Sequence, residues 1–144
     1  MDPEIIADYK NEVGEGPMWH PREKLLYWGD ISKGQIFRFD PSTEKHELFY
    51  EGDSMIGGYT FQENGTLLLF MEKGAIAELR DGTLKYLVRE LPGEDGNRFN
   101  DVIADPSGRV FCGTIPLDPN VAMEGERLGT LYRLDTDGTI TAIL

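Results

Sequence analysis

The chain has 144 residues, of which 40% are hydrophobic and 28% are charged, and its formal net charge is −12 at pH 7. The apolar share is large enough to bury a core, but so acidic a surface repels phosphate backbones and anionic lipids, so we expect neither a nucleic-acid partner nor a membrane partner. No apolar run approaches the length of a membrane span, and the first residues lack the basic start of a secretory signal. The single cysteine, Cys112, excludes an intramolecular disulfide and fits a reducing cytoplasm, and its apolar run predicts a buried small hydrophobe.

Short apolar runs bounded by Gly, Pro, Asn or Asp follow one another along the chain, as is typical of strands separated by tight turns. In chain order we expect strands at residues 25–28, 36–39, 66–70, 84–88, 109–112 and 130–134. The dipeptides at 64–65, 81–82 and 137–138 are Asn-Gly or Asp-Gly, which favour hairpin turns. Only residues 119–128 could hold a helical turn, and we expect a loop there.

The strand pattern repeats in two registers. Leu26, Leu68 and Val110 recur at intervals of 42 residues, each after a polar turn. A second pattern, a glycine followed by alternating apolar residues, recurs at 34–40, 74–80 and 129–135. A period near 40–45 residues with several short strands per repeat is typical of a β-propeller blade. An evenly turned β-sandwich is the alternative, but it does not require two matched registers.

We therefore predict an all-β, β-propeller fold with about three four-stranded blades in a single, partial domain. Its units are an amino-terminal strand at 1–19 and repeats at 20–61, 62–104 and 105–144. Propellers usually need about four to eight blades to close a ring. Three blades therefore predict either part of a longer ring or a half that pairs with another molecule.

Two segments concentrate residues that can carry chemistry. In the first, Glu15 stands between Gly14 and Gly16, ahead of the apolar Trp19; a hard cation would accept such a carboxylate, although a lone Glu in a turn is also typical of a solvated loop. The second, residues 97–101, places Arg, Asn and Asp around one Phe. Arg can bind carboxylate or polyol oxygens and an Asn carbonyl can serve a metal or a water, whereas the alternative is a loop network that caps backbone groups.

Four motifs carry a resemblance to a known family. They are G-E-G-P-x-W at 14–19, L-Y-W-x-D-I at 26–31, R-F-N-D-x-x-x-D-P-x-G-R-x-F-x-G-T at 98–114 and G-T-L-Y-R-L at 129–134. Together they resemble the gluconolactonase, regucalcin (senescence marker protein) and luciferin-regenerating enzyme family. The resemblance covers essentially the whole chain, but only about the first half of a family member.

The resemblance implies a six-bladed propeller that hydrolyses a sugar lactone with one divalent cation, Ca²⁺, Zn²⁺, Mn²⁺ or Mg²⁺, at the mouth of its central channel. By position it implies Glu15 as a metal ligand, and Arg98 and Asn100 as contacts to the hydroxyls and ring oxygens of the substrate. Asp118 falls where some members carry an acidic substrate contact, although residues 115–117 depart from the family pattern. The cation would polarise the lactone carbonyl and lower the pKa of a bound water.

The resemblance also implies that the remaining metal ligands, an Asn and an Asp that is also the base, come from later blades. We therefore expect no catalytic base within the 144 residues. The leading hypothesis is the amino-terminal half of a lactonase whose activity belongs to the complete ring, with the chain alone inactive. The alternatives are a half-propeller that homodimerises into a ring with metal or ligand binding but little activity, and a non-catalytic binding module.

Overall fold

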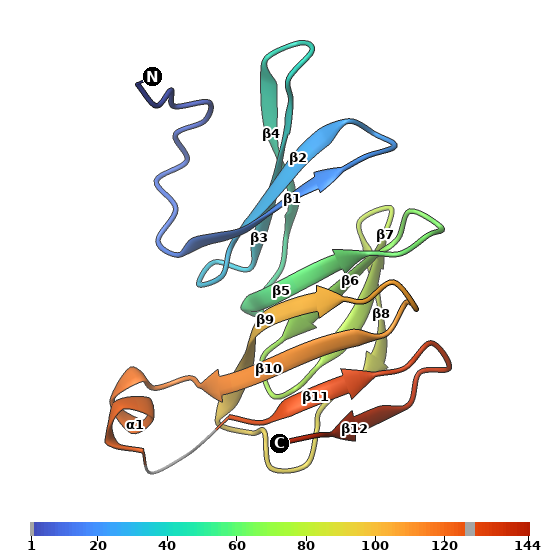
Figure 1. Cartoon of the computed structure of the whole chain (residues 1–144). Coiled ribbons are helices and arrows are strands. Elements are labelled where there is room, and N and C mark those ends of the chain that lie inside the picture. Colours follow the sequence, from blue (N-terminus) through green and yellow to red (C-terminus); the bar gives the residue numbers. More distant parts are fainter. Residues whose placement is uncertain (1, 126–128) are drawn as a thin grey trace. The chain divides into compact units, whose positions relative to one another are not determined.

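The computed structural model describes residues 2–125 and 129–144, and within them it contains three four-stranded antiparallel sheets (Figure 1). The first sheet contains β1 (Gly14–His20), β2 (Leu25–Asp30), β3 (Gln35–Asp40) and β4 (Lys45–Glu51). The second contains β5 (Ile56–Phe61), β6 (Leu67–Met71), β7 (Ile76–Arg80) and β8 (Thr83–Val88). The third contains β9 (Asn97–Ala104), β10 (Val110–Pro116), β11 (Leu131–Leu134) and β12 (Ile140–Ala142).

Each sheet is a simple meander in which strands that follow one another in the chain are hydrogen-bonded neighbours. Four short antiparallel strands per sheet are the form of a propeller blade, so the prediction of an all-β fold built from three such blades is confirmed. The repeat units at 20–61 and 62–104 are offset from the sheets by one strand, because each holds the last three strands of one sheet and the first strand of the next.

The chain divides into two compact units, Met1–Met55 with the first sheet and Ile56–Leu144 with the other two. In the first unit, the rings of Trp28 and Phe37 stack on neighbouring strands with centroids 5.4 Å apart. The amino-terminal segment reaches this pair through Tyr9, whose ring lies 4.3 Å from that of Phe37. A hydrogen bond of 2.8 Å between the Tyr9 hydroxyl and Nδ1 of His46 holds the segment on the sheet.

In the second unit, the core fills the space between the two sheets. The buried residues of this cluster are Leu68, Phe70, Ile76, Leu91, Phe99, Val110, Cys112, Tyr132 and Leu134. The Phe99 ring packs edge-on against Phe70 at 5.4 Å and against Tyr132 at 6.3 Å. Cys112 is buried as expected, and that burial raises the pKa of its thiol to about 12.

The two sheets of the second unit meet along β5 and β9, which lie side by side (Figure 1). At Gly57 the strands approach so closely that an added Cβ would stand 1.7 Å from the carbonyl oxygen of Phe99. Only a residue without a side chain leaves room for this backbone contact. Gly57 therefore sets the spacing of the two sheets.

The expected loop at 119–128 is wrong over its first part, where the chain forms the helix α1 (Pro119–Glu124). Asp118 caps the helix by accepting a hydrogen bond of 2.8 Å from the backbone N–H of Asn120, and Pro119 supplies a first residue whose dihedral angle suits a helix. Residues 126–128 of the expected loop lie outside the described residues. Within the described residues, no helix has the length and apolar character needed to span a membrane.

Replacing Gly57 by Ala should force β5 away from β9 and lower the free energy of unfolding of the second unit by about 1–3 kcal/mol or more. Urea unfolding followed by far-UV circular dichroism measures the loss. Gly113→Ala is the matched control, because its Cβ would meet no described heavy atom within 4 Å. Equal stabilities for the two variants would contradict the close contact at Gly57.

Candidate functional site

Glu15 lies in the first unit, near the start of β1, with an exposed side chain. It pairs with Gly29, and the register between β1 and β2 then shifts before the next pair, Met18 with Tyr27. The extra residue makes a bulge, and Gly16 within it has a φ of 63°, a conformation that suits glycine. Bulges are frequent next to functional sites, where they re-aim side chains, and this one directly follows Glu15.

The segment ahead of Glu15 is held by Asp30, whose side chain is 0% exposed. Its carboxylate accepts hydrogen bonds from the backbone N–H groups of Glu12 at 2.9 Å and Val13 at 3.1 Å. The side-chain amide of Asn11 and the ammonium of Lys33 lie 3.4 and 3.6 Å away. Burial by itself would raise the pKa of Asp30, but these hydrogen bonds and the nearby ammonium outweigh it and hold the pKa below its usual value.

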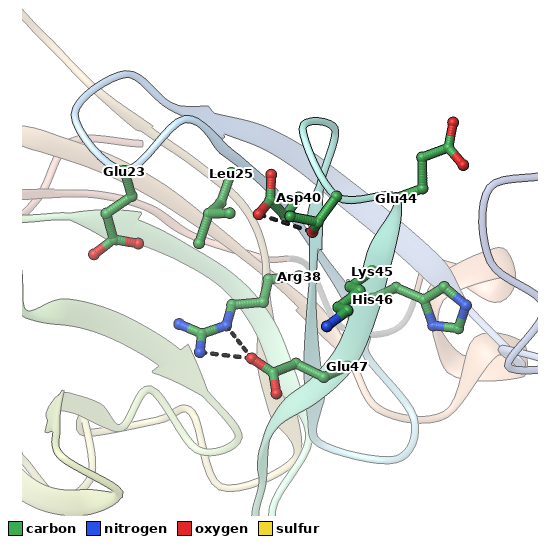
Figure 2. A pocket seen from close by; sticks show the side chains of 9 residues that line it. Glu23, Leu25, Arg38, Asp40, Glu44, Lys45, His46 and Glu47 are labelled. Carbon is green, nitrogen blue, oxygen red and sulfur yellow. Dashed lines mark hydrogen bonds and ion pairs between the residues drawn. The ribbon is translucent and has the colours of Figure 1, made fainter.

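A pocket of about 740 Å³ occupies the other end of the first sheet, between the β1–β2 turn and the β3–β4 hairpin. Figure 2 shows Arg38 and Glu47 reaching toward each other in it, while the His46 ring points away. Nη2 of Arg38 lies 2.6 Å from Oε1 of Glu47, and its guanidinium stands 4.7 Å from the centre of the Phe49 ring. Glu15 does not line this pocket, so the pocket is separate from the candidate metal ligand.

Arg98 and Asn100 lie together in the second unit, near the start of β9. Nη1 of Arg98 donates to the carbonyl of Phe99 at 2.9 Å and to Oδ1 of Asn100 at 3.0 Å. Nδ2 of Asn100 in turn donates to Oδ2 of Asp101 at 3.1 Å. The structure therefore brings the two predicted substrate contacts into one hydrogen-bonded chain.

A second bulge occurs at this point. Gly113 of β10 pairs with Asp101 and the next residue, Thr114, pairs with Phe99, so Asn100 is the extra residue of β9. The bulge turns Asn100 out of the regular alternation and toward the Arg98 guanidinium. Both candidate segments, the one at Glu15 and the one at Asn100, therefore carry a bulge in the first strand of their sheet.

A buried polar cluster joins Glu94, in the loop before β9, to the start of β9 and to β11. Nδ2 of Asn97 donates to one oxygen of the Glu94 carboxylate at 2.7 Å, and the Tyr132 hydroxyl donates to the other at 2.8 Å. Burial, followed by the bond to Glu94, raises the pKa of Tyr132. The sequence pattern points to residues 97–101 but not to Glu94, because a lone Glu in a polar loop gives no sign of burial.

Asp118 is placed by the structure at the start of α1, where it is exposed. Its Oδ1 accepts hydrogen bonds from the backbone and the side-chain amide of Asn120, at 2.8 and 3.1 Å. The predicted substrate contact thus has a structural task, the capping of α1. Its neighbour Leu117 is tied to the loop before β9, since its N–H donates to the carbonyl of Gly96 at 2.9 Å.

The donor groups of the described residues do not gather into a metal cluster. Across 2–125 and 129–144, no group of three or more His, Cys, Asp or Glu side chains could hold a metal ion. Glu15 alone supplies at most two oxygens, whereas Ca²⁺ takes about six to eight. The described residues therefore offer one candidate ligand and not a complete site.

The SMP-30/Gluconolactonase/LRE-like region matches residues 13–144. The chain belongs to this family. Family membership confirms the resemblance carried by the motifs at 14–19 and 98–114, and it makes the chain a member of a sugar lactonase family.

Among its relatives in the family, the chain is 46% identical over 138 residues to the pentonolactonase XacC of Haloferax volcanii, covering 96% of this chain and 44% of that protein. It is 29% identical over 138 residues to regucalcin of Xenopus laevis, covering 95% of this chain and 46% of the relative. The chain thus spans about half the length of the curated relatives it matches.

Solved structures of the family agree with the fold. A luciferin-regenerating enzyme matches with a TM-score of 0.76 and 27% identity over 90% of this chain and 44% of that one. A calcium-binding protein, regucalcin from Agrobacterium tumefaciens, matches with a TM-score of 0.74 and 20% identity over 92% of this chain and 43% of that one. The second match, at this identity, supports the fold alone.

Replacing Asp30 by Asn should lower the free energy of unfolding at pH 7 by about 1–3 kcal/mol, because the buried acceptor loses its charge. The pKa of Asp30 is lowered in the folded protein, so its contribution to stability is present above the unfolded value, about 3.9, and is lost as the pH falls below it. The variant should therefore lose less stability than the parent between neutral pH and pH values below about 4.

Tryptophan fluorescence measures the unfolding of the first unit specifically, because both tryptophans, Trp19 and Trp28, lie in that unit. Asp53→Asn, at an exposed position of the same unit, is the control for the loss of one charge. Identical pH profiles for the parent and the Asp30 variant would contradict the role given to this carboxylate.

Proposed function

We propose that the chain supplies three blades of a β-propeller that hydrolyses sugar lactones, and that the active ring needs blades beyond these 144 residues. The observation that carries the proposal is the pairing of Arg98 with Asn100 on the bulged start of β9. The family supports the reaction class, since its members include a pentonolactonase and a 6-deoxy-6-sulfogluconolactonase.

The chemistry of these side chains suits a small polyol ring. The guanidinium of Arg98 has several N–H donors in a fixed plane, of which Nη1 is held by Asn100 and the Phe99 carbonyl. The amide of Asn100 offers both a donor and an acceptor. We assign Arg98 and Asn100 to the hydroxyls and ring oxygen of the lactone, and Asp118, at the start of α1, to a further hydroxyl.

Glu15 is proposed as one ligand of a divalent cation, Ca²⁺, Zn²⁺, Mn²⁺ or Mg²⁺. A carboxylate in a bulged, glycine-flanked segment is a hard oxygen donor that backbone can surround. When bound, such a cation polarises a lactone carbonyl. We place the other ligands and the base that accepts a proton from water outside this chain, since the described residues form no cluster with Glu15.

In this proposal the chain's own residues bind and orient the lactone. Arg98 stays cationic at every physiological pH, so it can stabilise negative charge that develops on substrate oxygens. Asn100 is fixed between Arg98 and Asp101, which leaves its direction set before the substrate arrives. We place the protein in the cytoplasm, for which a single buried cysteine is the support.

A second proposal is a ring formed by two copies of this chain, with ligand binding and little activity. It is favoured by exposed apolar side chains on the third sheet, where Ile103 of β9 is 69% exposed and Ile143, after β12, is 44% exposed. Exposed apolar side chains on a sheet without a neighbour favour association. The third possibility, a non-catalytic binding module, differs from both proposals because it would hydrolyse no lactone.

Lactone hydrolysis tests the main proposal in the chain alone and in a fusion of the chain to the part of the Haloferax volcanii pentonolactonase that lies outside the matched segment. We expect the chain alone to be inactive or weak and the fusion to be active with an added divalent cation. In the fusion, Glu15→Gln should raise the metal concentration for half-maximal rate by about tenfold or more. Arg98→Lys should lower kcat/KM by about tenfold or more with an unchanged metal dependence.

Glu4→Gln, at an exposed position in the amino-terminal segment, controls for the loss of one carboxylate. A Glu15 variant with the metal dependence of the parent fusion would contradict the assignment of Glu15. An active fusion that is indifferent to Arg98→Lys would contradict the assignment of the substrate site.

Light scattering tests the second proposal through the mass in solution. A folded assembly of two chains should have twice the 16.2 kDa of one chain and should melt cooperatively. Ile103→Lys places a charge at an exposed apolar position of the third sheet and should shift the protein toward the monomer, while Leu87→Lys, on β8 of the second sheet, controls for the charge itself. A cooperatively melting monomer would contradict the assembly.

A further inference from the structure

Glu94 is a buried carboxylate for which the reaction proposed above has no use. Its side chain is 2% exposed. None of the ion pairs found within residues 2–125 and 129–144 involves it, so no described cation balances its charge. A buried carboxylate is costly unless its hydrogen bonds are complete. The two groups that donate to Glu94 therefore make its burial possible.

Those two groups come from different strands of the third sheet. Asn97 is the first residue of β9, and its Nδ2 donates to Oε2 of Glu94 at 2.7 Å. Tyr132 lies on β11, and its hydroxyl donates to Oε1 at 2.8 Å. One carboxylate thus joins the beginning of β9 to a strand that is two positions away in the sheet order.

Asn97 is itself 1% exposed, and its Oδ1 is the one buried side-chain oxygen or nitrogen of the described residues that has no hydrogen-bond partner. Among the described residues its amide is therefore oriented by Glu94 alone, since the one side-chain hydrogen bond found there for Asn97 goes to that carboxylate. Removing the carboxylate would leave both ends of a buried amide without a partner.

The loop that carries Glu94 also connects the two predicted substrate-binding segments. The carbonyl of Gly96 accepts from the N–H of Leu117, next to Asp118, at 2.9 Å. The carbonyl of Asn97, next to Arg98, accepts from the N–H of Lys73 at 2.8 Å. On its other side the loop is anchored by the N–H of Leu91, which donates to the carbonyl of Lys73 at 3.0 Å.

We propose that Glu94 is a positioning residue, whose bonds to Asn97 and Tyr132 hold the start of β9 and the residues before α1 in the arrangement that Arg98, Asn100 and Asp118 need. The arrangement of these segments is a property of the second unit alone. That this arrangement serves to bind a lactone rests on the proposed function. The experiments therefore measure the positioning by Glu94 and the binding of a polyol ring separately.

Amide hydrogen exchange of the full chain, read by NMR, tests the positioning. Glu94→Gln puts an NH₂ group or a single carbonyl where two donors need acceptors, and Tyr132→Phe removes one of those donors. Both variants should speed exchange at Arg98, Asn100 and Leu117 by about tenfold or more, because a lost buried hydrogen bond is worth about that factor. Exchange at Leu69 and Ala77, in β6 and β7, should stay within about twofold.

A double variant restores the bonds with donor and acceptor exchanged. In Glu94→Gln with Asn97→Asp, the new amide can donate to the new carboxylate and accept from Tyr132. Slow exchange at Arg98, Asn100 and Leu117 should return. Glu90→Gln, an exposed position in the same connection, removes the same charge and should change none of these signals.

Titration of the same samples with 1,5-anhydro-D-glucitol, a stable polyol ring, measures binding. We expect shifts at Arg98 and Asn100 in the parent and about tenfold weaker binding in Glu94→Gln. Unchanged exchange near β9, or a uniform rise throughout the unit, would overturn the role of Glu94. If exchange in the Glu94 variants rises only near β9 while the parent shows no shifts with the polyol, the positioning role of Glu94 stands, and the assignment of Arg98 and Asn100 to a polyol ring fails.

Discussion

The contact between the backbones of β5 and β9 is the constraint on which the second unit depends. Gly57 leaves no side chain between the strands, and its neighbour across the gap is the carbonyl of Phe99. With the strands this close, the Phe99 ring enters the core between the two sheets and packs on Phe70 and Tyr132. Arg98 and Asn100, on either side of Phe99, are only half-buried, which is what a binding residue on a strand requires.

Two buried carboxylates perform the same task at the two candidate segments. Asp30 binds the backbone just before Glu15, and Glu94 binds the side chain just before Arg98. In both cases an acidic group inside the protein fixes the residues that lead into the first strand of a sheet. In both cases a local bulge lies next to the candidate side chain. The polar groups proposed to meet a ligand are thus held by polar groups that the solvent does not reach.

The fold could be predicted closely because its signals are local. The apolar runs around Leu26, Leu68 and Val110 became β2, β6 and β10, and the turns between them became the hairpins of three sheets. The prediction failed at α1, where Asp118 and Pro119 start a helix that the surrounding strand pattern hid. Capping depends on a few contacts within one turn, and a long repeat pattern carries no information about them.

The sequence alone predicted the all-β fold, the repeat and the family, and it pointed to the candidate residues Glu15, Arg98 and Asn100. It could do so because alternation, turn residues and motifs are properties of neighbouring positions. The tertiary structure alone decided which acidic residues are buried. Glu94 and Tyr132 are 38 positions apart and meet only because the third sheet places β11 two strands from β9, on the other side of β10. Burial and pairing depend on such contacts between distant positions, and a pattern read along one chain cannot contain them.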